Sequence, residues 1–262
     1  MKKTKVIIPA LGILLLSTAA SVTGTVAWFS SNTSVFANNM NVKCKAEYGI
    51  VIANTSGAGA TYNNSVDAAV TAQKELKPTS TYNLTTWLFS TSTNPGAANT
   101  QQKYETVATA ADYYVVHDFY IRSSAGTALT VQSLDIKKVT ATQTENQALS
   151  ASLRVGFMFE HDTANVYIYA PVAGYTTSYS VQKAAGNYSN AEGARETVAP
   201  KAGTVVSNTA VTELPANTAQ GEHVSVYVWF EGEDANCISN NLSASLTNIK
   251  IDVEFGYTAV SA

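Results

Sequence analysis

The residues best suited to chemistry in this chain form one acidic cluster. Glu231, Glu233, Asp234 and Asn236 follow an apolar run and are separated only by small residues. Carboxylate and amide oxygens in a tight turn can bind Ca²⁺, which takes about six to eight oxygen ligands. The spacing differs from the Asp-x-Asp-x-Asp-Gly pattern of the common calcium loop, and the alternative is a solvated turn that caps a strand. Calcium at this turn is the one cofactor for which the sequence offers a candidate site.

Arrangements for catalysis are hard to find elsewhere. The three histidines, His117, His161 and His223, lie far apart, and none belongs to a His-Glu-x-x-His helix. His117 sits in an apolar run, which predicts a core position, whereas the other two fall in a predicted hairpin loop and at a strand start. No Gly-x-Ser-x-Gly elbow is present. We therefore predict that the protein is not an enzyme; a hydrolase would need His161, Glu160 and the acidic cluster in one cleft.

The two cysteines, Cys44 and Cys237, leave two interpretations open. In an exported protein such a pair could form a disulfide. The alternative is two buried thiols that pack as small apolar side chains. The sequence does not decide between them, because a disulfide requires a short distance between the two α-carbons.

Aromatic residues are frequent, with 14 Tyr and 3 Trp. Tyr167 with Tyr169, and Tyr227 with Trp229, would each share one face of a strand, because strand side chains alternate between faces. Rings placed in this way could bind a glycan or fill the core of a sandwich. We favour packing over glycan binding.

Short strands separated by polar turns must position these residues. The clearest strand is 249–257, where apolar and polar residues alternate with period two. Apolar patterns predict further strands at 44–52, 81–90, 113–121, 128–139, 153–159, 166–170 and 223–231. Range 65–75 could be a short helix or a strand, and 100–111 could hold a turn or two of helix. Ranges 90–109 and 174–218 are rich in loop residues, and the length of the second predicts short strands within it, near 175–181 and 203–206. About ten short strands predict an all-β fold, a two-sheet β-sandwich or jelly roll.

The first 27 residues have the order of a secretory signal peptide. Three lysines precede an apolar run at 6–16, and small residues follow. That run is shorter than the roughly 20 apolar residues that span a bilayer. We expect an N-terminal signal helix that is cut after Ala27 or Trp28, the alternative being an uncleaved anchor. Residues 28–262 would then form a single extracellular domain.

The composition limits the partners of this domain. Charged residues make up only 13% of the chain and the net charge is −3. Such a surface lacks the Lys/Arg clusters that nucleic acid requires. It also generates little self-repulsion, so copies of the chain can pack closely together.

Several segments resemble the TasA/camelysin family. The stretch Gly24-Thr25-Val26-Ala27-Trp28-Phe29-Ser30 is similar to the end of that family's leader. Leu76-Lys77-Pro78 is similar to a short segment found early in the family. Segments 118–123, 153–157 and 228–237 look like recurrent strands of surface proteins with the same leader.

The resemblance implies export through a SipW-type signal peptidase, a jelly-roll fold and a role as fibre subunit of the biofilm matrix. In such fibres the freed N-terminal segment of one subunit completes a sheet of the next. Here that donor segment would be 29–41, with Phe29, Val35, Phe36 and Met40 as its apolar side chains. Camelysin relatives are classed as metalloproteases, but no matching metal motif is present, so that activity is not carried over.

We therefore expect a secreted structural protein of the cell surface or biofilm matrix. Its partners would be copies of itself and other cell-surface or matrix proteins, after a signal peptidase has acted during export. The alternative is a surface-displayed module that binds a glycan or another ligand, like an adhesin or lectin.

Overall fold

A computed structural model describes most of the chain beyond the predicted leader. The described residues are 35–38, 40–57, 59–69, 74–91, 102–143, 149–188, 193–203, 205–234, 236–237, 246–247 and 249–261. The predicted signal helix, the cleavage site at Ala27 or Trp28, and Phe29 lie outside these residues. In the described part, no helix is long and apolar enough to cross a membrane.

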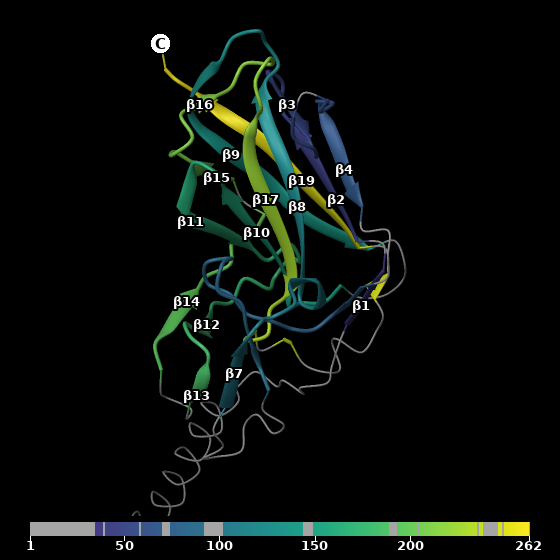
Figure 1. The fold of residues 1–262 in the computed structure, drawn as a ribbon, viewed down its shortest axis with the longest axis vertical. Coiled ribbons are helices and arrows are strands. Elements are labelled where there is room, and N and C mark those ends of the chain that lie inside the picture. The colour runs from purple at the N-terminus through teal and green to yellow at the C-terminus, as the bar shows by residue number, and fades with distance from the viewer. Residues whose placement is uncertain are drawn as a thin grey trace, which may run out of the picture.

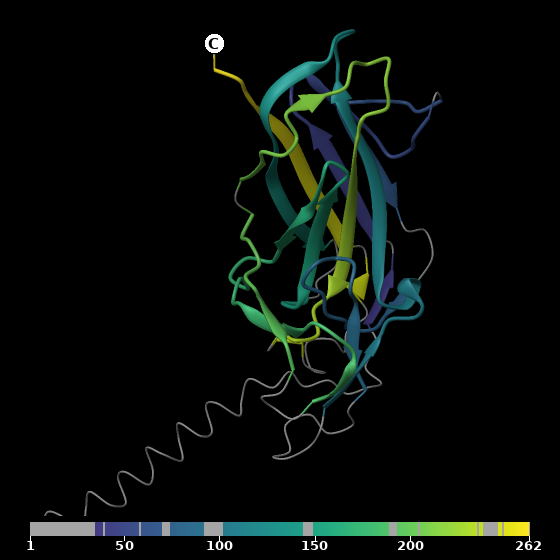
Figure 2. The same cartoon turned by 60° about the vertical axis from the view of Figure 1, so that its left-hand side comes forward.

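Two packed sheets form the body of the molecule (Figures 1 and 2). The smaller has the order β11-β10-β17-β8-β3 and comprises β3 (Ile50–Ala53), β8 (Tyr114–Ser123), β10 (Leu153–Phe159), β11 (Asp162–Tyr169) and β17 (Glu222–Phe230). The larger has the order β15-β9-β19-β2-β4, with β16 beside β9, and comprises β2 (Asn41–Ala46), β4 (Ser65–Ala69), β9 (Leu129–Gln143), β15 (Val206–Asn208), β16 (Glu213–Leu214) and β19 (Ile249–Ala259). The predicted all-β, two-sheet sandwich is confirmed.

Shorter strands extend one end of the sandwich, where β1, β7 and β12–β14 gather in Figure 1. They form the sheets β18-β1-β5, β13-β7-β6 and β12-β14. Their bounds are β1 (Val35–Asn38), β5 (Lys74–Leu76), β6 (Leu88–Ser90), β7 (Gln102–Thr106), β12 (Tyr179–Gln182), β13 (Gly186–Tyr188), β14 (Arg195–Val198) and β18 (Leu246–Thr247). A short 3₁₀-helix, η1 (Ala110–Asp112), precedes β8.

The main core lies between the two body sheets. On β19 the apolar residues of the period-two pattern are buried from Ile249 to Phe255, and Tyr257 is half-buried. They face the smaller sheet, where Phe157 meets Phe255 edge to face with ring centroids 6.0 Å apart. Each such side chain contributes about 1.5–3 kcal/mol through burial. This burial explains why the alternating pattern at the C-terminus predicted a strand correctly.

The predicted strand 44–52 is wrong, because it is two strands in different sheets. Gly49 adopts a φ of +98°, which glycine tolerates and other residues rarely adopt. The chain therefore turns between β2 and β3 and crosses from the larger sheet to the smaller one.

The predicted strand 81–90 is also largely wrong, since only β6 at its end is a strand. Before β6, side chains bond the backbone in place of a strand partner. The Thr81 hydroxyl accepts from the Leu84 amide at 2.9 Å, and the Asn83 carboxamide oxygen accepts from the Thr86 amide at 2.8 Å. The resulting loop places Leu84 and Trp87 against the outer face of the smaller sheet.

The described residues of the two ranges with helical composition contain no α-helix. The first, 65–75, contains β4 and so matches its strand alternative, and the second, 100–111, contains β7 and part of η1. The loop-rich range 174–218 holds the short strands β12 to β16. Of these, β12 overlaps the strand expected near 175–181, and β15 begins where the one expected near 203–206 ends.

Candidate functional site

The predicted donor segment supplies the middle strand of the sheet β18-β1-β5. Val35 lies opposite Leu76 in an antiparallel pair with β5, and Ala37 lies opposite Leu246 in a parallel pair with β18. Phe36 lies opposite Glu75 in the same antiparallel pair of β1 with β5. The strand is thus paired on both edges within its own chain.

β1 is a continuation of β2 in the same register. Asn38 lies opposite Thr247, and three positions later in both strands Asn41 lies opposite Lys250. The parallel ladder between the N-terminal and C-terminal strands therefore keeps its alignment across a short interruption. Met40, at this interruption, is 1% exposed and belongs to the main core. Met40 thus anchors the base of the donor segment in its own subunit.

The acidic cluster is largely buried rather than a solvated turn, and two of its three carboxylates pair with arginines. Asp234 forms an ion pair with Arg154 of β10, whose side chain is fully buried. The same guanidinium donates to the carbonyl oxygens of Ala151 and Leu153, both at 2.8 Å. The Asn236 amide donates to Asp234 Oδ1 at 2.8 Å from both its backbone and side-chain nitrogen. Asp234 therefore joins the turn after β17 to the start of β10.

Glu233 has a different arginine as its partner. Arg195 of β14 lies 2.7 Å from Glu233 Oε2, and the Tyr104 hydroxyl donates to Oε1 at 2.8 Å. Burial raises the pKa of Glu233 above its usual value, although the arginine and the tyrosine act against this shift. The carboxylate links β7 and β14 to the body of the sandwich.

Glu231 is fully buried and has no ion pair in the described part of the chain. Its carboxylate accepts hydrogen bonds from the Trp229 indole at 3.0 Å and from the Glu233 amide at 3.0 Å. Burial raises its pKa to about 7, although hydrogen bonds from Ser80 and Trp229 and the nearby Arg154 lower it. Three carboxylates thus share two arginines, and Glu231 is the one left over.

This arrangement suits stabilisation rather than cation binding. Each carboxylate is held by its own protein donors, and the Asn236 side chain turns its NH₂ group, a donor, toward Asp234. Among the described residues, no group of three His, Cys, Asp or Glu side chains is placed to hold a metal ion.

The histidines do not meet the acidic cluster. His161, in the turn between β10 and β11, pairs with the buried Glu222 at the start of β17, and this hydrogen bond raises the pKa of His161. Glu231 follows the other end of β17, roughly 30 Å away at about 3.3 Å per residue. The grouping that a hydrolase would need is therefore not formed. His117 lies on the inward side of β8, as predicted, but is only half-buried.

A Ser-His-Asp group does occur on the outer face of the smaller sheet, but its bonding differs from that of a hydrolase. Asp118 Oδ1 accepts from the Ser225 hydroxyl at 2.7 Å and contacts His223 Nε2 at 2.9 Å. A triad serine gives its proton to histidine, which the carboxylate orients from the far side of the ring. Here the serine donates to the carboxylate.

Cys44 and Cys237 are free thiols in the structure and do not form a disulfide. Cys44 lies on β2, whereas Cys237 follows the acidic turn, and both are buried in the main core. Burial raises the pKa of both thiols. They pack as small apolar side chains, which was the alternative interpretation.

The paired aromatic residues pack against neighbours. Tyr169 is fully buried and contacts Phe157 edge to face at 5.5 Å. Trp229 is also fully buried, beneath the Trp87 ring at 5.3 Å. Tyr169 and Trp229 are thus inaccessible to a glycan. Their partners in the predicted pairs, Tyr167 and Tyr227, are half-buried.

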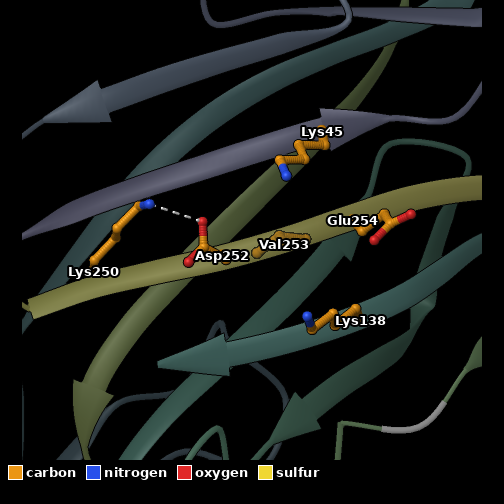
Figure 3. Close-up of a pocket in the computed structure, with 6 residues that line it drawn as sticks. All are labelled: Lys45, Lys138, Lys250, Asp252, Val253 and Glu254. Carbon is orange, nitrogen blue, oxygen red and sulfur yellow. Dashed lines mark ion pairs between the residues drawn. The ribbon is translucent and has the colours of Figure 1, made fainter. Parts of the chain in front are cut away.

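A hollow of about 240 Å³ lies on the outer face of the larger sheet (Figure 3). It is lined by Lys45, Lys138, Lys250, Asp252, Val253 and Glu254. Lys45 and Lys138 reach toward β19 from the strands on either side of it, as Figure 3 shows. The alternating pattern of β19 predicted a wet face, but not that lysines of distant strands would gather there.

Comparisons with known proteins add nothing to this picture, because no family model, curated protein or solved structure matches the chain. Arg154 and Arg195 were not predicted from the sequence as partners of the acidic cluster. Arg154 carried a signal, because a charged residue inside the apolar run 153–159 must be paired if that run is buried.

Proposed function

We propose that the chain is a secreted structural protein of the cell surface or biofilm matrix that polymerises with copies of itself. A signal peptidase would cut after Ala27 or Trp28, and the freed N-terminal segment would leave its own subunit and pair with the next. In this proposal the chain has no catalytic role, and other cell-surface or matrix proteins are further partners.

The observation that carries the proposal is the position of β1 in its sheet. The strand lies between β5 and β18, and it precedes the core anchor Met40. A middle strand near one terminus can be exchanged between subunits at low cost, because the pairings lost in one subunit are regained in the other. An emptied position exposes two unpaired edges, which bind an incoming strand through main-chain hydrogen bonds.

Substitution of Ala37 by proline tests strand exchange. Proline removes a ladder hydrogen bond and is tolerated poorly in a strand paired on both sides. We expect purified residues 28–262 to form filaments in electron micrographs and Ala37→Pro to remain monomeric. Ala37→Ser, which keeps the amide, is the matched control and should still polymerise.

A synthetic peptide of residues 29–41 provides a second test. In excess it should occupy the acceptor edges and stop filament growth. Filaments of Ala37→Pro as abundant as those of the unsubstituted chain would contradict the proposal, as would a mature chain that stays monomeric at high concentration. N-terminal sequencing of extracellular protein should begin at Trp28 or Phe29 if the leader is removed as expected.

A further inference from the structure

The outer face of the larger sheet carries charges that alternate in sign from strand to strand. On the face defined by the pairing register, the stripes are negative on β4 (Asp67), positive on β2 (Lys43 and Lys45), negative on β19 (Asp252 and Glu254) and positive on β9 (Lys138). Two described residues depart from this order, and each is paired on its own strand. Lys250 at the start of β19 pairs with Asp252 at 3.4 Å, and the buried Asp135 of β9 pairs with Lys137 at 2.9 Å.

Part of this charge has no ion-pair partner in the described residues. Glu254 lies in register between Lys45 and Lys138, yet none of the three forms an ion pair there. All three side chains are exposed around the hollow of Figure 3. Lys43 reaches Asp67 only at 3.9 Å, and such exposed pairs contribute little, about 0–1 kcal/mol. The face therefore retains charges that can pair elsewhere.

The four stripes are complementary to themselves. Consider a second copy placed face to face, related by a two-fold axis parallel to the strands between β2 and β19. Because Lys43 and Asp252 are register partners, the axis brings Lys43 of one copy over Asp252 of the other. It likewise brings Lys45 over Glu254, and it places β4 over β9 with Asp67 over Thr140, two residues along the strand from Lys138. We propose that this charged face is a contact between two copies of the chain, separate from the exchange of β1.

The size of the face sets the strength of the contact. Four strands at about 4.8 Å spacing and two charged rows give a few hundred Å² per copy, against about 800 Å² in a typical stable interface. A contact of this size and polarity is weak in a single pair and sensitive to salt. Arrayed along polymers of the kind proposed above, many such contacts act together and would hold filaments side by side.

Charge reversal tests the contact with the complete mature chain. Lys43→Glu/Lys45→Glu makes the three stripes β4, β2 and β19 acidic, and Asp252→Lys/Glu254→Lys makes β2, β19 and β9 basic. Each variant alone should reduce the lateral association of filaments. We expect the fraction of filaments found in bundles, counted in electron micrographs, to fall about tenfold. Wild-type bundles should disperse between about 50 mM and 500 mM NaCl, because screening shortens the reach of the charges.

Two controls separate stripe complementarity from net charge. The fourfold variant with both pairs reversed has the wild-type net charge and again opposes unlike stripes, so it should bundle as the wild type does. Lys183→Glu/Lys201→Glu changes the net charge as the acidic variant does, but lies outside this face, and should also bundle normally. A reversal variant that bundles like the wild type, or a folded fourfold variant that does not, overturns the proposal.

The outcome does not depend on polymerisation. If the mature chain forms no filaments, the same variants are compared as soluble protein by sedimentation equilibrium at millimolar concentration. Salt-sensitive self-association with the same ranking supports the contact even though strand exchange has failed. A wild type that is monomeric in that measurement overturns it.

Discussion

Arg154 is charged and fully buried, so its effect on stability depends on Asp234. Removing one partner of a buried ion pair leaves the other charge without compensation, which costs about 3–5 kcal/mol. We expect Asp234→Ala to lower the free energy of unfolding by that amount in urea titrations. Asp252→Ala, at a half-exposed surface ion pair, is the control and should cost less than about 1 kcal/mol. Equal effects of the two substitutions would contradict a stabilising role of the buried ion pair between Arg154 and Asp234.

Glu231 makes the stability depend on pH. Burial raises its pKa from the usual 4.5 to about 7 in the folded state, so the folded chain binds the proton more tightly than the unfolded chain. Stability should therefore fall as pH rises from 4.5 to 7, by up to about 3 kcal/mol. In Glu231→Gln this fall should disappear from unfolding free energies measured across that range. An unchanged pH dependence would mean that Glu231 ionises normally.

His161 shifts stability in the same direction. Its hydrogen bond with Glu222 raises the histidine pKa above the usual 6.5, so the folded chain again binds the proton more tightly. The contribution of the pair is fully present below about pH 6.5 and is lost as pH rises through the folded pKa. In Glu222→Gln the pKa of His161, followed by NMR titration, should return toward 6.5. No change in the titration would show that the pairing is absent in solution.

At the scale of elements, the loop 82–87 depends on a glycine in the strand beneath it. A Cβ on Gly156 of β10 would lie 2.7 Å from Leu84 Cδ2 and 3.0 Å from Trp229 Cζ3. Overpacking of this kind costs about 1–3 kcal/mol. Gly156→Ala should lower the melting temperature, whereas Gly126→Ala, with no atom within 4 Å, should not.

A double substitution shows whether the loop itself is the cause. Leu84→Ala removes the side chain that the new Cβ would meet. The combined Leu84→Ala/Gly156→Ala variant should therefore lose less stability than the sum of the two single variants. Additive losses would indicate that Leu84 does not lie over Gly156.

The elements that the sequence predicted correctly are those whose pattern is local. Strand β19 alternates with period two from Ile249 to Tyr257, and one buried face is enough to cause that pattern. The prediction of a strand at 81–90 failed because Leu84 and Trp87 are apolar for another reason. They lie in a loop that covers the sheet formed by β10 and β17. The ion pairs of Glu233 and Asp234 were not predicted, because Arg195 and Arg154 come from strands distant in sequence.

At the scale of the whole molecule, the larger sheet depends on its central strand, β19. β19 lies between β9 and β2, and its side chains fill the centre of the main core. Deleting residues 249–262 should therefore abolish cooperative unfolding, as seen by circular dichroism during heating. Deleting only 260–262, beyond β19, should leave the transition unchanged. A cooperative transition in the longer deletion would show that the sandwich forms without its central strand.

The parallel pairing of β2 with β19 also fixes when the protein can fold. A ribosome makes residues 41–46 long before residues 249–259, so β2 lacks this neighbour until β19 has been synthesised. Contacts between such distant segments form slowly. The larger sheet therefore stays incomplete for most of the time that a ribosome takes to synthesise residues 41–259.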